Sequence, residues 1–153
     1  MKYYWVNQNQ TFKQETEGGY MWSPLQNANG SRNQFYENMR LVEPGDKVFS
    51  FKNTYVVCIG EILSTAEESA KPNEFGSAGQ NWSNIGWRVE VKYATLNNKL
   101  KPKEFISELR PTLPEKYSPL QENGNGNGTR TESDHYVSPD HSSSCFLFSC
   151  AWC

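Results

Sequence analysis

Histidine is absent from residues 1–122 of this sequence, because both histidines, His135 and His141, lie further along the chain. Cysteine is almost absent from the same region, where Cys58 stands alone in an apolar stretch typical of packing. Imidazole is the commonest general base in enzymes, and the glycines present lack the strand, helix and Lys-Ser or Lys-Thr context of a phosphate-binding loop. We therefore expect residues 1–122 to be non-catalytic and to use neither a metal nor a cofactor.

Long apolar runs and an excess of one charge are missing too. No segment is apolar enough to cross a membrane and no signal peptide precedes the first strand-like residues, so we expect a cytoplasmic protein without membrane contact. Over residues 1–122 the Lys and Arg residues equal the Asp and Glu residues, fourteen of each, although the chain carries a net charge of -2. This balance argues against nucleic-acid binding driven mainly by charge. The glutamates, among them Glu15 and Glu74, lie between polar neighbours and are interpreted as solvated charges.

Aromatic residues are abundant instead. They make up 14% of the chain, with five Trp, eight Tyr and eight Phe, which exceeds what a small core requires. Composition changes at residue 123, where Asn-Gly repeats lead into a Ser-rich acidic segment. We predict one domain over residues 1–122 and a disordered low-complexity tail over residues 123–153. The cysteines at the end of the tail are an alternative metal cluster, but Cys-x4-Cys-x2-Cys is not a usual zinc spacing.

The segment 44–63 is predicted to form the central β-hairpin. Residues 48–51 form a short strand, Asn53-Thr54 reverses the chain, and residues 55–63 return as a longer apolar strand. Gly60 interrupts the second strand, which indicates a bulge, a barrel bend or a place where another backbone or a ligand comes close. Strict alternation predicts a further half-buried strand over residues 87–93, with Val89 and Val91 on its apolar face.

Other elements are predicted from local signals. Residues 3–6 form a short strand, residues 7–19 are irregular, and residues 31–42 form a helix that Pro44-Gly45 ends. Residues 64–86 are a long polar loop, which is typical of a functional segment. Asn97-Asn98 turns the chain before a short helix over residues 102–110 that buries Phe105, Ile106 and Leu109. The expected fold class is therefore α+β.

Several motifs in order carry a resemblance to a known family. They are Tyr4-Trp5-Val6, Tyr20-Met21-Trp22-Ser23, Arg32-Asn33 before a helix, Pro44 to Phe51, Ile59-Gly60-Glu61-Ile62, and Trp82 with Trp87 to Val91. The sequence resembles the EVE domains of the PUA-like superfamily, which are related to YTH domains. This resemblance implies a small, strongly curved mixed β-barrel with flanking helices, and a pocket that holds one extruded, often modified nucleobase.

The resemblance also implies a set of site residues. Trp22 matches the pocket tryptophan, Asn33 the polar residue beside it, Ser50 the residue under the base, and Trp82 the aromatic residue of the long loop. The candidate base-binding residues are Trp22, Ser23, Asn33, Ser50, Phe51 and Trp82, and the candidate contacts to nucleic-acid backbone are Arg32, Lys52 and Lys71. Trp22 and Trp82 are expected in polar loops, facing each other across the base, whereas Trp5 and Trp87 are expected in the core.

The function expected from this resemblance is a non-catalytic reader of a modified base, such as methylated cytosine in DNA. Such domains often precede a nuclease domain in modification-dependent restriction proteins, so a nuclease domain is an expected partner. A reader of RNA with the same fold is the first alternative, and a module that binds a protein or a small molecule is the second.

Overall fold

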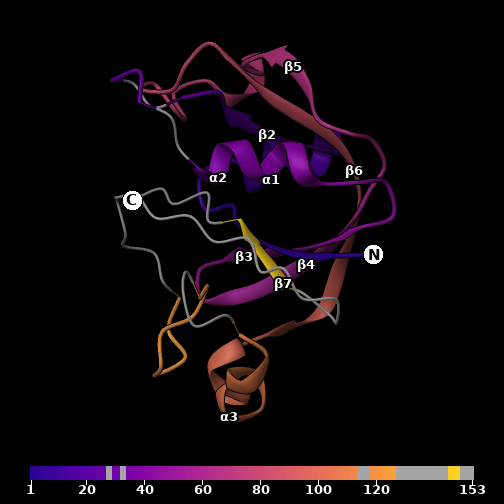
Figure 1. Ribbon diagram of the computed structural model, residues 1–153, viewed down its shortest axis with the longest axis vertical. Coiled ribbons are helices and arrows are strands. Elements are labelled where there is room, and N and C mark those ends of the chain that lie inside the picture. Colours follow the sequence, from indigo (N-terminus) through magenta and orange to yellow (C-terminus); the bar gives the residue numbers. More distant parts are fainter. Residues whose placement is uncertain (27–28, 32–33, 114–117, 127–144, 149–153) are drawn as a thin grey trace.

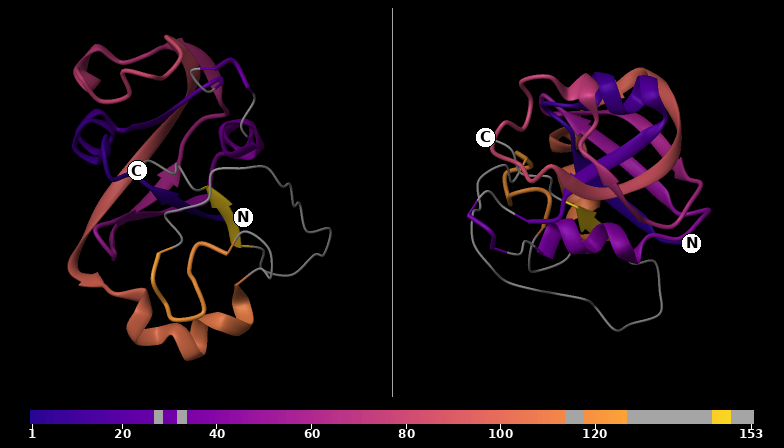
Figure 2. Two further views of the ribbon diagram at one scale, coloured as in Figure 1. Left: turned by 90° about the vertical axis from the view of Figure 1, so that its left-hand side faces the viewer. Right: turned by 90° about the horizontal axis from the view of Figure 1, so that it is seen from above.

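The sheet of this protein is mixed and strongly curved, and it forms a half-barrel with few helices (Figures 1 and 2). The structure is a computed structural model that describes residues 1–26, 29–31, 34–113, 118–126 and 145–148. The strands are β1 (Tyr3–Asn7), β2 (Tyr20–Pro24), β3 (Lys47–Lys52), β4 (Tyr55–Ile62), β5 (Glu67–Ala70), β6 (Ile85–Leu100) and β7 (Cys145–Phe148). Their order is β2-β6-β4-β3-β1-β7, with β5 also paired to β6. The predicted α+β class is confirmed.

The helices are short and lie around this sheet (Figure 1). They are α1 (Phe12–Gly18), α2 (Gln34–Glu37) and α3 (Ile106–Leu109), with the 3-10 turns η1 (Asn38–Leu41), η2 (Asn73–Phe75), η3 (Pro102–Phe105) and η4 (Arg110–Thr112). The helix predicted over residues 31–42 is present as α2 and η1. The expected irregular structure over residues 7–19 is wrong where α1 forms. In η3, Phe105 is 43% exposed, so its predicted burial is also wrong.

The central hairpin is confirmed as the antiparallel pair β3–β4. Asn53 and Thr54 adopt positive φ angles of 50° and 71°, which is the backbone geometry of a tight two-residue hairpin turn. The ladder shifts register between Ser50 and Phe51. Gly60 lies where side chains of β6 approach closely, because an added Cβ would come within 2.5 Å of Val91 Cγ1. The groups that approach Gly60 are thus side chains, and not the second backbone or the ligand that the sequence suggested.

Strand β6 joins the two parts of the sheet. Its first half pairs with β2 on one side and β5 on the other, and its second half pairs with β4. The turn predicted at Asn97-Asn98 is wrong, since both residues lie within β6. The ladder with β4 is interrupted at this point, because Thr95 pairs with Cys58 and Leu100 with Val56, so the two asparagines lie in a bulge of β6.

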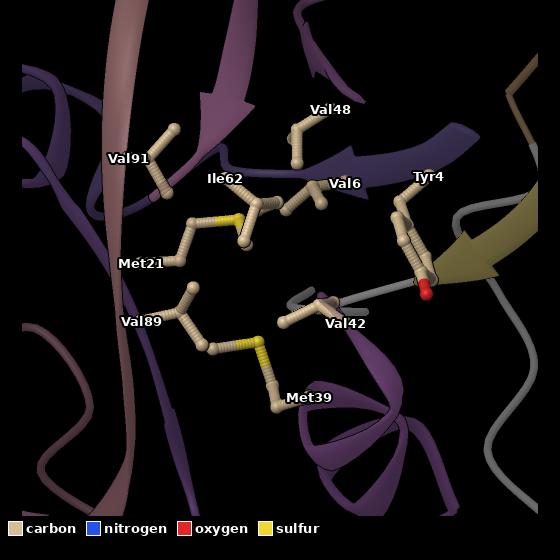
Figure 3. Packing of buried hydrophobic residues seen from close by; sticks show 9 residues of the cluster. All are labelled: Tyr4, Val6, Met21, Met39, Val42, Val48, Ile62, Val89 and Val91. Carbon is tan, nitrogen blue, oxygen red and sulfur yellow. The ribbon is translucent and has the colours of Figure 1, made fainter. Parts of the chain in front are cut away.

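The main core fills the concave side of the half-barrel (Figure 3). It is made of Tyr4, Val6, Met21, Met39, Val42, Val48, Ile62, Val89 and Val91. Val89 and Val91 are buried and Trp87 packs beside them, as the alternation over residues 87–93 predicts. Met21 of β2 and Met39 of η1 complete the cluster, and their flexible side chains can fill irregular space in a core.

The end of the chain contributes one described strand. β7 runs parallel to β1, so that β1 lies between β3 and β7. Leu120 and Gly126 form an isolated antiparallel bridge. The domain boundary at residue 122 stays a prediction. Among the described residues, no helix has both the length and the apolar character that a membrane crossing requires.

Candidate functional site

A second apolar cluster lies apart from the main core, and we call it the aromatic cluster. It consists of Tyr20, Trp22, Phe75 and Trp82. Trp22 lies in strand β2, which continues through Ser23 and Pro24, so its expected position in a loop is wrong. Trp82 does lie in the long loop between β5 and β6. Both rings are buried, with exposed fractions of 3% for Trp22 and 7% for Trp82.

The rings of Trp22 and Trp82 stack directly on each other. Their centroids are 6.1 Å apart and their planes differ by 23°. Phe75 meets both indoles edge-on, at 5.7 Å from Trp22 and 6.0 Å from Trp82. A base held between two rings needs their planes about 7 Å apart, since each aromatic contact occupies roughly 3.5 Å. The indoles must therefore separate before a base can lie between them.

Two glycines allow this close packing. An added Cβ at Gly86 would lie 2.2 Å from the backbone oxygen of Ser23 and 2.4 Å from Trp22 Cζ2. At Gly79, where φ is 66°, an added Cβ would lie 2.1 Å from the Trp82 ring. Any side chain at either position would displace an indole, so Gly79 of the long loop and Gly86 of β6 are required by the aromatic cluster.

A buried carboxylate supports the aromatic cluster from the side of α1. Glu15 is 3% exposed, so its interpretation as a solvated charge is wrong. Its Oε1 accepts the backbone N–H of Trp22 at 2.8 Å, and its Oε2 accepts Gln8 Nε2 at 2.8 Å and Thr11 Oγ1 at 3.0 Å. Burial raises the pKa of Glu15 to about 7, although these three hydrogen bonds favour the ionised form.

The hydrogen bonds around Glu15 link the end of β1 to β2, two strands that do not pair with each other. β2 lies at one end of the sheet order, so its outer edge needs partners from elsewhere. Glu15 accepts the N–H of Trp22, and the Tyr93 hydroxyl donates to the carbonyl oxygen of Tyr20 at 3.1 Å. Gln8, which directly follows β1, donates to both Glu15 and the Tyr93 oxygen. Side chains thus do here what a backbone ladder does in a closed barrel.

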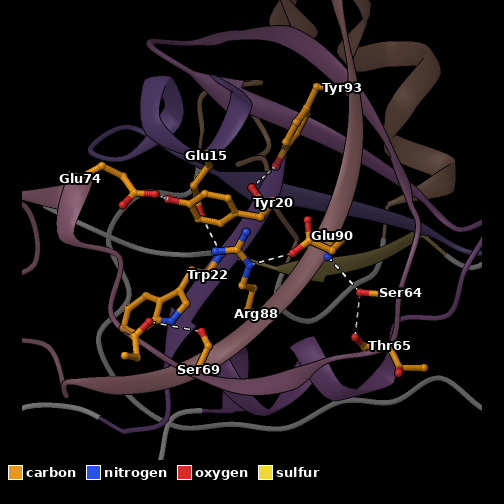
Figure 4. A network of polar contacts seen from close by, with 11 residues as sticks. Glu15, Tyr20, Trp22, Ser64, Thr65, Ser69, Glu74, Arg88, Glu90 and Tyr93 are labelled. Carbon is orange, nitrogen blue, oxygen red and sulfur yellow. Dashed lines mark hydrogen bonds and ion pairs between the residues drawn. The ribbon is translucent and has the colours of Figure 1, made fainter. Parts of the chain in front are cut away.

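The long loop is tied to β2 and β6 by charged and aromatic contacts (Figure 4). The Tyr20 hydroxyl donates to Glu74 Oε1 at 2.8 Å. The pKa of Glu74 is held below its ordinary value by a hydrogen bond with its own backbone and then by the one from Tyr20. Arg88 lies 4.1 Å above the Tyr20 ring and donates from Nε to Glu90 Oε1 at 2.7 Å. Glu74 is therefore an anchor of the loop, since its partner Tyr20 belongs to the aromatic cluster.

Several buried polar atoms have no hydrogen-bond partner among the described residues. They are Asn7 Oδ1, Gln8 Oε1, Trp22 Nε1, Ser23 Oγ, Ser50 Oγ and Trp87 Nε1. Ser23 pairs with Trp87, and this pair faces the main core, whereas Trp22 faces the aromatic cluster on the other side of the sheet. The Arg40 guanidinium lies 5.1 Å from the centre of the Trp87 ring. Unpartnered buried donors are uncommon and need an explanation.

The predicted site residues fall into separate groups. Trp22 and Trp82 belong to the aromatic cluster, whereas Ser23, although next to Trp22 on β2, faces the opposite side of the sheet with its paired residue Trp87. Ser50 and Phe51 lie on β3, which pairs with β1 and β4, and Phe51 packs on Trp5 at 5.0 Å between ring centroids. Lys52 lies over the Phe12 ring and Lys71 Nζ donates to the carbonyl oxygen of Gly79 at 3.3 Å. Arg32 and Asn33 lie outside the described residues.

Sequence reasoning missed Phe75 and Glu15 as part of the site. Phe75 is the one large apolar residue between Leu63 and Trp82, and that isolation in a polar loop is a signal for an anchor. No such signal marks Glu15, because its buried position depends on partners from three segments. Within the part of the chain that the structure describes, no group of three His, Cys, Asp or Glu residues is placed to hold a metal ion.

Comparison with known proteins gives likeness to solved structures alone. No family model matches the chain, and no curated protein matches it. A protein from Rhodopseudomonas palustris is 19% identical over 72% of this chain and 73% of its own, with a TM-score of 0.46. A hypothetical protein from Leishmania major is 14% identical over 70% of this chain and 74% of its own, with a TM-score of 0.48. A protein from Pseudomonas putida is 14% identical over 79% of this chain and 93% of its own, with a TM-score of 0.47.

Proposed function

We propose that this protein is a non-catalytic reader that binds one extruded, modified base of DNA, with methylated cytosine as the leading ligand. The fold class expected for such a reader, a PUA-like domain of the EVE type, is part of the same proposal. The bound base stacks on Trp22 and Trp82, and a nuclease domain on another chain or on a longer form of this chain cuts the DNA. The protein then acts as the specificity module of a restriction system.

One observation carries the proposal: Trp22 Nε1, a buried donor without a partner among the described residues, belongs to one of the two stacked indoles. An indole N–H can only donate, so a ligand that offers an acceptor would satisfy it. A nucleobase combines a flat aromatic face with ring acceptors and exocyclic groups on its edge. It is therefore a ligand that satisfies both parts of this arrangement, stacking on the rings while its edge accepts from the Trp22 N–H group.

Binding requires the Trp22–Trp82 stack to open. The long loop carries Trp82, while Trp22 is fixed within β2, so the separation comes from movement of Trp82. The lost indole contact is replaced by stacking of the base on both faces, which is worth ~1 to 3 kcal/mol per face. This exchange offsets part of the few kcal/mol that flipping a base out of a duplex costs.

The test is a fluorescence titration of the full chain. The probes are matched DNA duplexes that carry one 5-methylcytosine, one N6-methyladenine or no modification, and an RNA oligonucleotide of the same sequence. Tighter binding of one modified duplex supports the proposal, and separation of the indoles should change the tryptophan emission. Tighter binding of the RNA would move the assignment to an RNA reader. Equal affinity for all probes would overturn the proposal.

A further inference from the structure

The end of the β3–β4 hairpin carries lysines and aromatic rings in alternation. Lys52 and Tyr55 pair at the last position of the ladder. Lys52 Nζ lies 4.9 Å from the centre of the Phe12 ring, and Lys101 Nζ lies 5.8 Å from the centre of the Tyr55 ring. Pairing of Val56 with Leu100 brings the end of β6 to the same place. We call the surface formed by Phe12, Lys52, Tyr55 and Lys101 the hairpin-end surface.

Positive charge is concentrated around this surface. The three segments that meet there are residues 9–13, 52–55 and 99–103, and they contain five lysines and no Asp or Glu. The lysines are Lys13, Lys52, Lys99, Lys101 and Lys103. The chain as a whole carries a net charge of -2, so this end of the molecule is positive against an acidic average. The balance of charge over residues 1–122 therefore hides a local excess.

Few carboxylates neutralise these lysines. Lys13 lies 4.0 Å from Glu17 in a pair whose side chains are 77% and 68% exposed, and such an exposed pair contributes little. The next acidic residue after Lys103 is Glu104, on η3. Lys13, Lys99 and Lys103 are exposed, while Lys52 and Lys101 are half-buried against their rings. The charges are thus available to a partner.

We propose that the hairpin-end surface and its neighbouring lysines bind the phosphate backbone of the nucleic acid whose base the aromatic cluster reads. This inference rests on the proposed function, because it takes the partner to be nucleic acid. Lysine neutralises phosphates and releases their counterions, which gives affinity without sequence selection. The aromatic rings restrict Lys52 and Lys101 before binding, so less side-chain freedom is lost when a phosphate is engaged.

Helix α1 connects the hairpin-end surface to the strand that carries Trp22. Phe12 begins α1, and Glu15 on the first turn of the same helix accepts the N–H of Trp22. α1 thus leads from the hairpin-end surface to β2. The aromatic cluster then supplies selection of the base, and the lysines supply affinity that depends on salt.

The experiment measures the salt dependence of DNA binding by fluorescence anisotropy, with a labelled duplex that carries one 5-methylcytosine and the unmodified duplex of the same sequence. Two variants of the full chain are compared with the parent: Lys52→Gln with Lys101→Gln, and Lys99→Gln with Lys103→Gln. The second pair consists of exposed side chains, so it tests the charge if the first pair unfolds the protein. Melting temperatures of each variant report on folding.

Removal of two phosphate contacts should reduce the slope of log K against log salt concentration by about 1.8. The parent should then lose about tenfold more affinity between 50 and 200 mM salt than either variant. Lys47→Gln with Lys92→Gln removes the same charge at the other end of β4 and should leave the slope unchanged. An equal change in this control, or unchanged slopes in both test variants, would overturn the inference.

The two probes separate this inference from the proposed function. If the slope falls on both duplexes while the parent does not prefer the modified duplex, the lysine surface stands and the base reader fails. If the parent prefers the modified duplex while the slopes are unchanged, the reader stands and the lysine surface fails. Failure of the parent to bind any duplex overturns both.

Discussion

The Glu15 carboxylate accepts the backbone N–H of Trp22 at 2.8 Å, so a buried acid on α1 fixes the strand that carries the central indole of the aromatic cluster. Gln8 and Thr11 donate to the other carboxylate oxygen, and both side chains are neutral. Among the described residues no Lys or Arg pairs with this acid. The position of Trp22 therefore depends on a group whose charge state changes near neutral pH.

The first prediction is that Glu15 makes folding stability fall as pH rises. Burial raises the pKa of Glu15 from 4.5 to about 7, so between these values the folded chain holds a proton that the unfolded chain has lost. The free energy of unfolding must then decrease with pH in that window, by roughly 2 to 3 kcal/mol between pH 5 and pH 8. Denaturant unfolding at several pH values measures it.

Glu15→Gln should remove this dependence, because the amide is neutral and retains an oxygen for the Trp22 N–H. Its new N–H group can be accepted by Gln8 Oε1, which has no partner among the described residues. Glu17→Gln is the control, since Glu17 lies exposed on the same helix. A parent protein with the same pH dependence as Glu15→Gln would show that this carboxyl does not titrate in the window.

The second prediction separates the indole N–H of Trp22 from its ring. Trp22→Phe keeps an aromatic ring in the cluster but removes Nε1, a buried donor without a partner among the described residues. Binding of the modified duplex should weaken by ~1 to 3 kcal/mol if this donor meets the base. Trp82→Phe is the matched control, because it preserves stacking from the opposite side. Equal affinities of Trp22→Phe and the parent would remove Trp22 Nε1 from the site.

Replacing either indole by alanine should lower folding stability as well as binding, whereas a tryptophan in an exposed loop would affect binding alone. Trp22→Ala and Trp82→Ala are expected to weaken binding, but both rings are buried within the aromatic cluster. Each truncation should therefore also cost folding stability, up to the ~3 to 5 kcal/mol typical of a buried Trp. Binding must be measured well below the melting temperature of each variant, with circular dichroism as the check on folding.

The third prediction concerns Gly86, which faces Trp22 and the backbone of Ser23. In Gly86→Ala the new Cβ would lie 2.2 Å from the Ser23 oxygen, so β2 and β6 must move apart. We expect a loss of ~1 to 3 kcal/mol in the free energy of unfolding, as for other overpacked positions. Ser69→Ala, at the position of β5 that pairs with Gly86, is the control and should change stability little. Thermal unfolding of both variants provides the measurement.

The sequence allowed prediction of those elements that local patterns determine. The hairpin around Asn53-Thr54 and the half-buried strand through Val89 and Val91 rest on turn chemistry and alternation, and both are present. Helix α1 was not predicted, because its buried residue is Glu15 and a buried carboxylate gives no apolar periodicity in the sequence. Its hydrogen bonds to Gln8, Thr11 and Trp22 exist only in the folded chain.

The candidate site was predictable in part for the same reason. Trp22 and Trp82 are distant in the sequence, and their pairing followed from the family resemblance rather than from any local pattern. Their direct contact, by contrast, depends on Gly79 and Gly86, which leave room for the rings. The positive charge of the hairpin-end surface was not predicted, because its lysines come from three separate segments and residues 1–122 as a whole carry equal numbers of acidic and basic residues.

The last prediction concerns deletion of residues 127–153. All residues of the main core lie between Tyr4 and Val91, so the shortened chain should fold cooperatively. Loss of β7 uncovers the edge of β1, and its backbone groups then bond to water instead of β7. We expect a cost of roughly 1 to 3 kcal/mol, the net value of a few backbone hydrogen bonds. Thermal unfolding of the two chains measures this difference.

An uncovered edge strand also favours pairing between copies of the chain. The shortened protein should therefore self-associate more than the full chain as concentration rises, which analytical ultracentrifugation detects. The control is a variant of the shortened chain in which the uncovered edge of β1 can no longer pair with another copy. Lys2→Pro is unsuitable for this purpose, because the backbone N–H of Lys2 donates to Asp46 Oδ1 at 2.7 Å. Trp5→Lys is better, because it adds a charge to the half-buried β1 position that pairs with Leu147. A shortened chain that fails to fold would place residues 127–153 within the domain and overturn the boundary at residue 122.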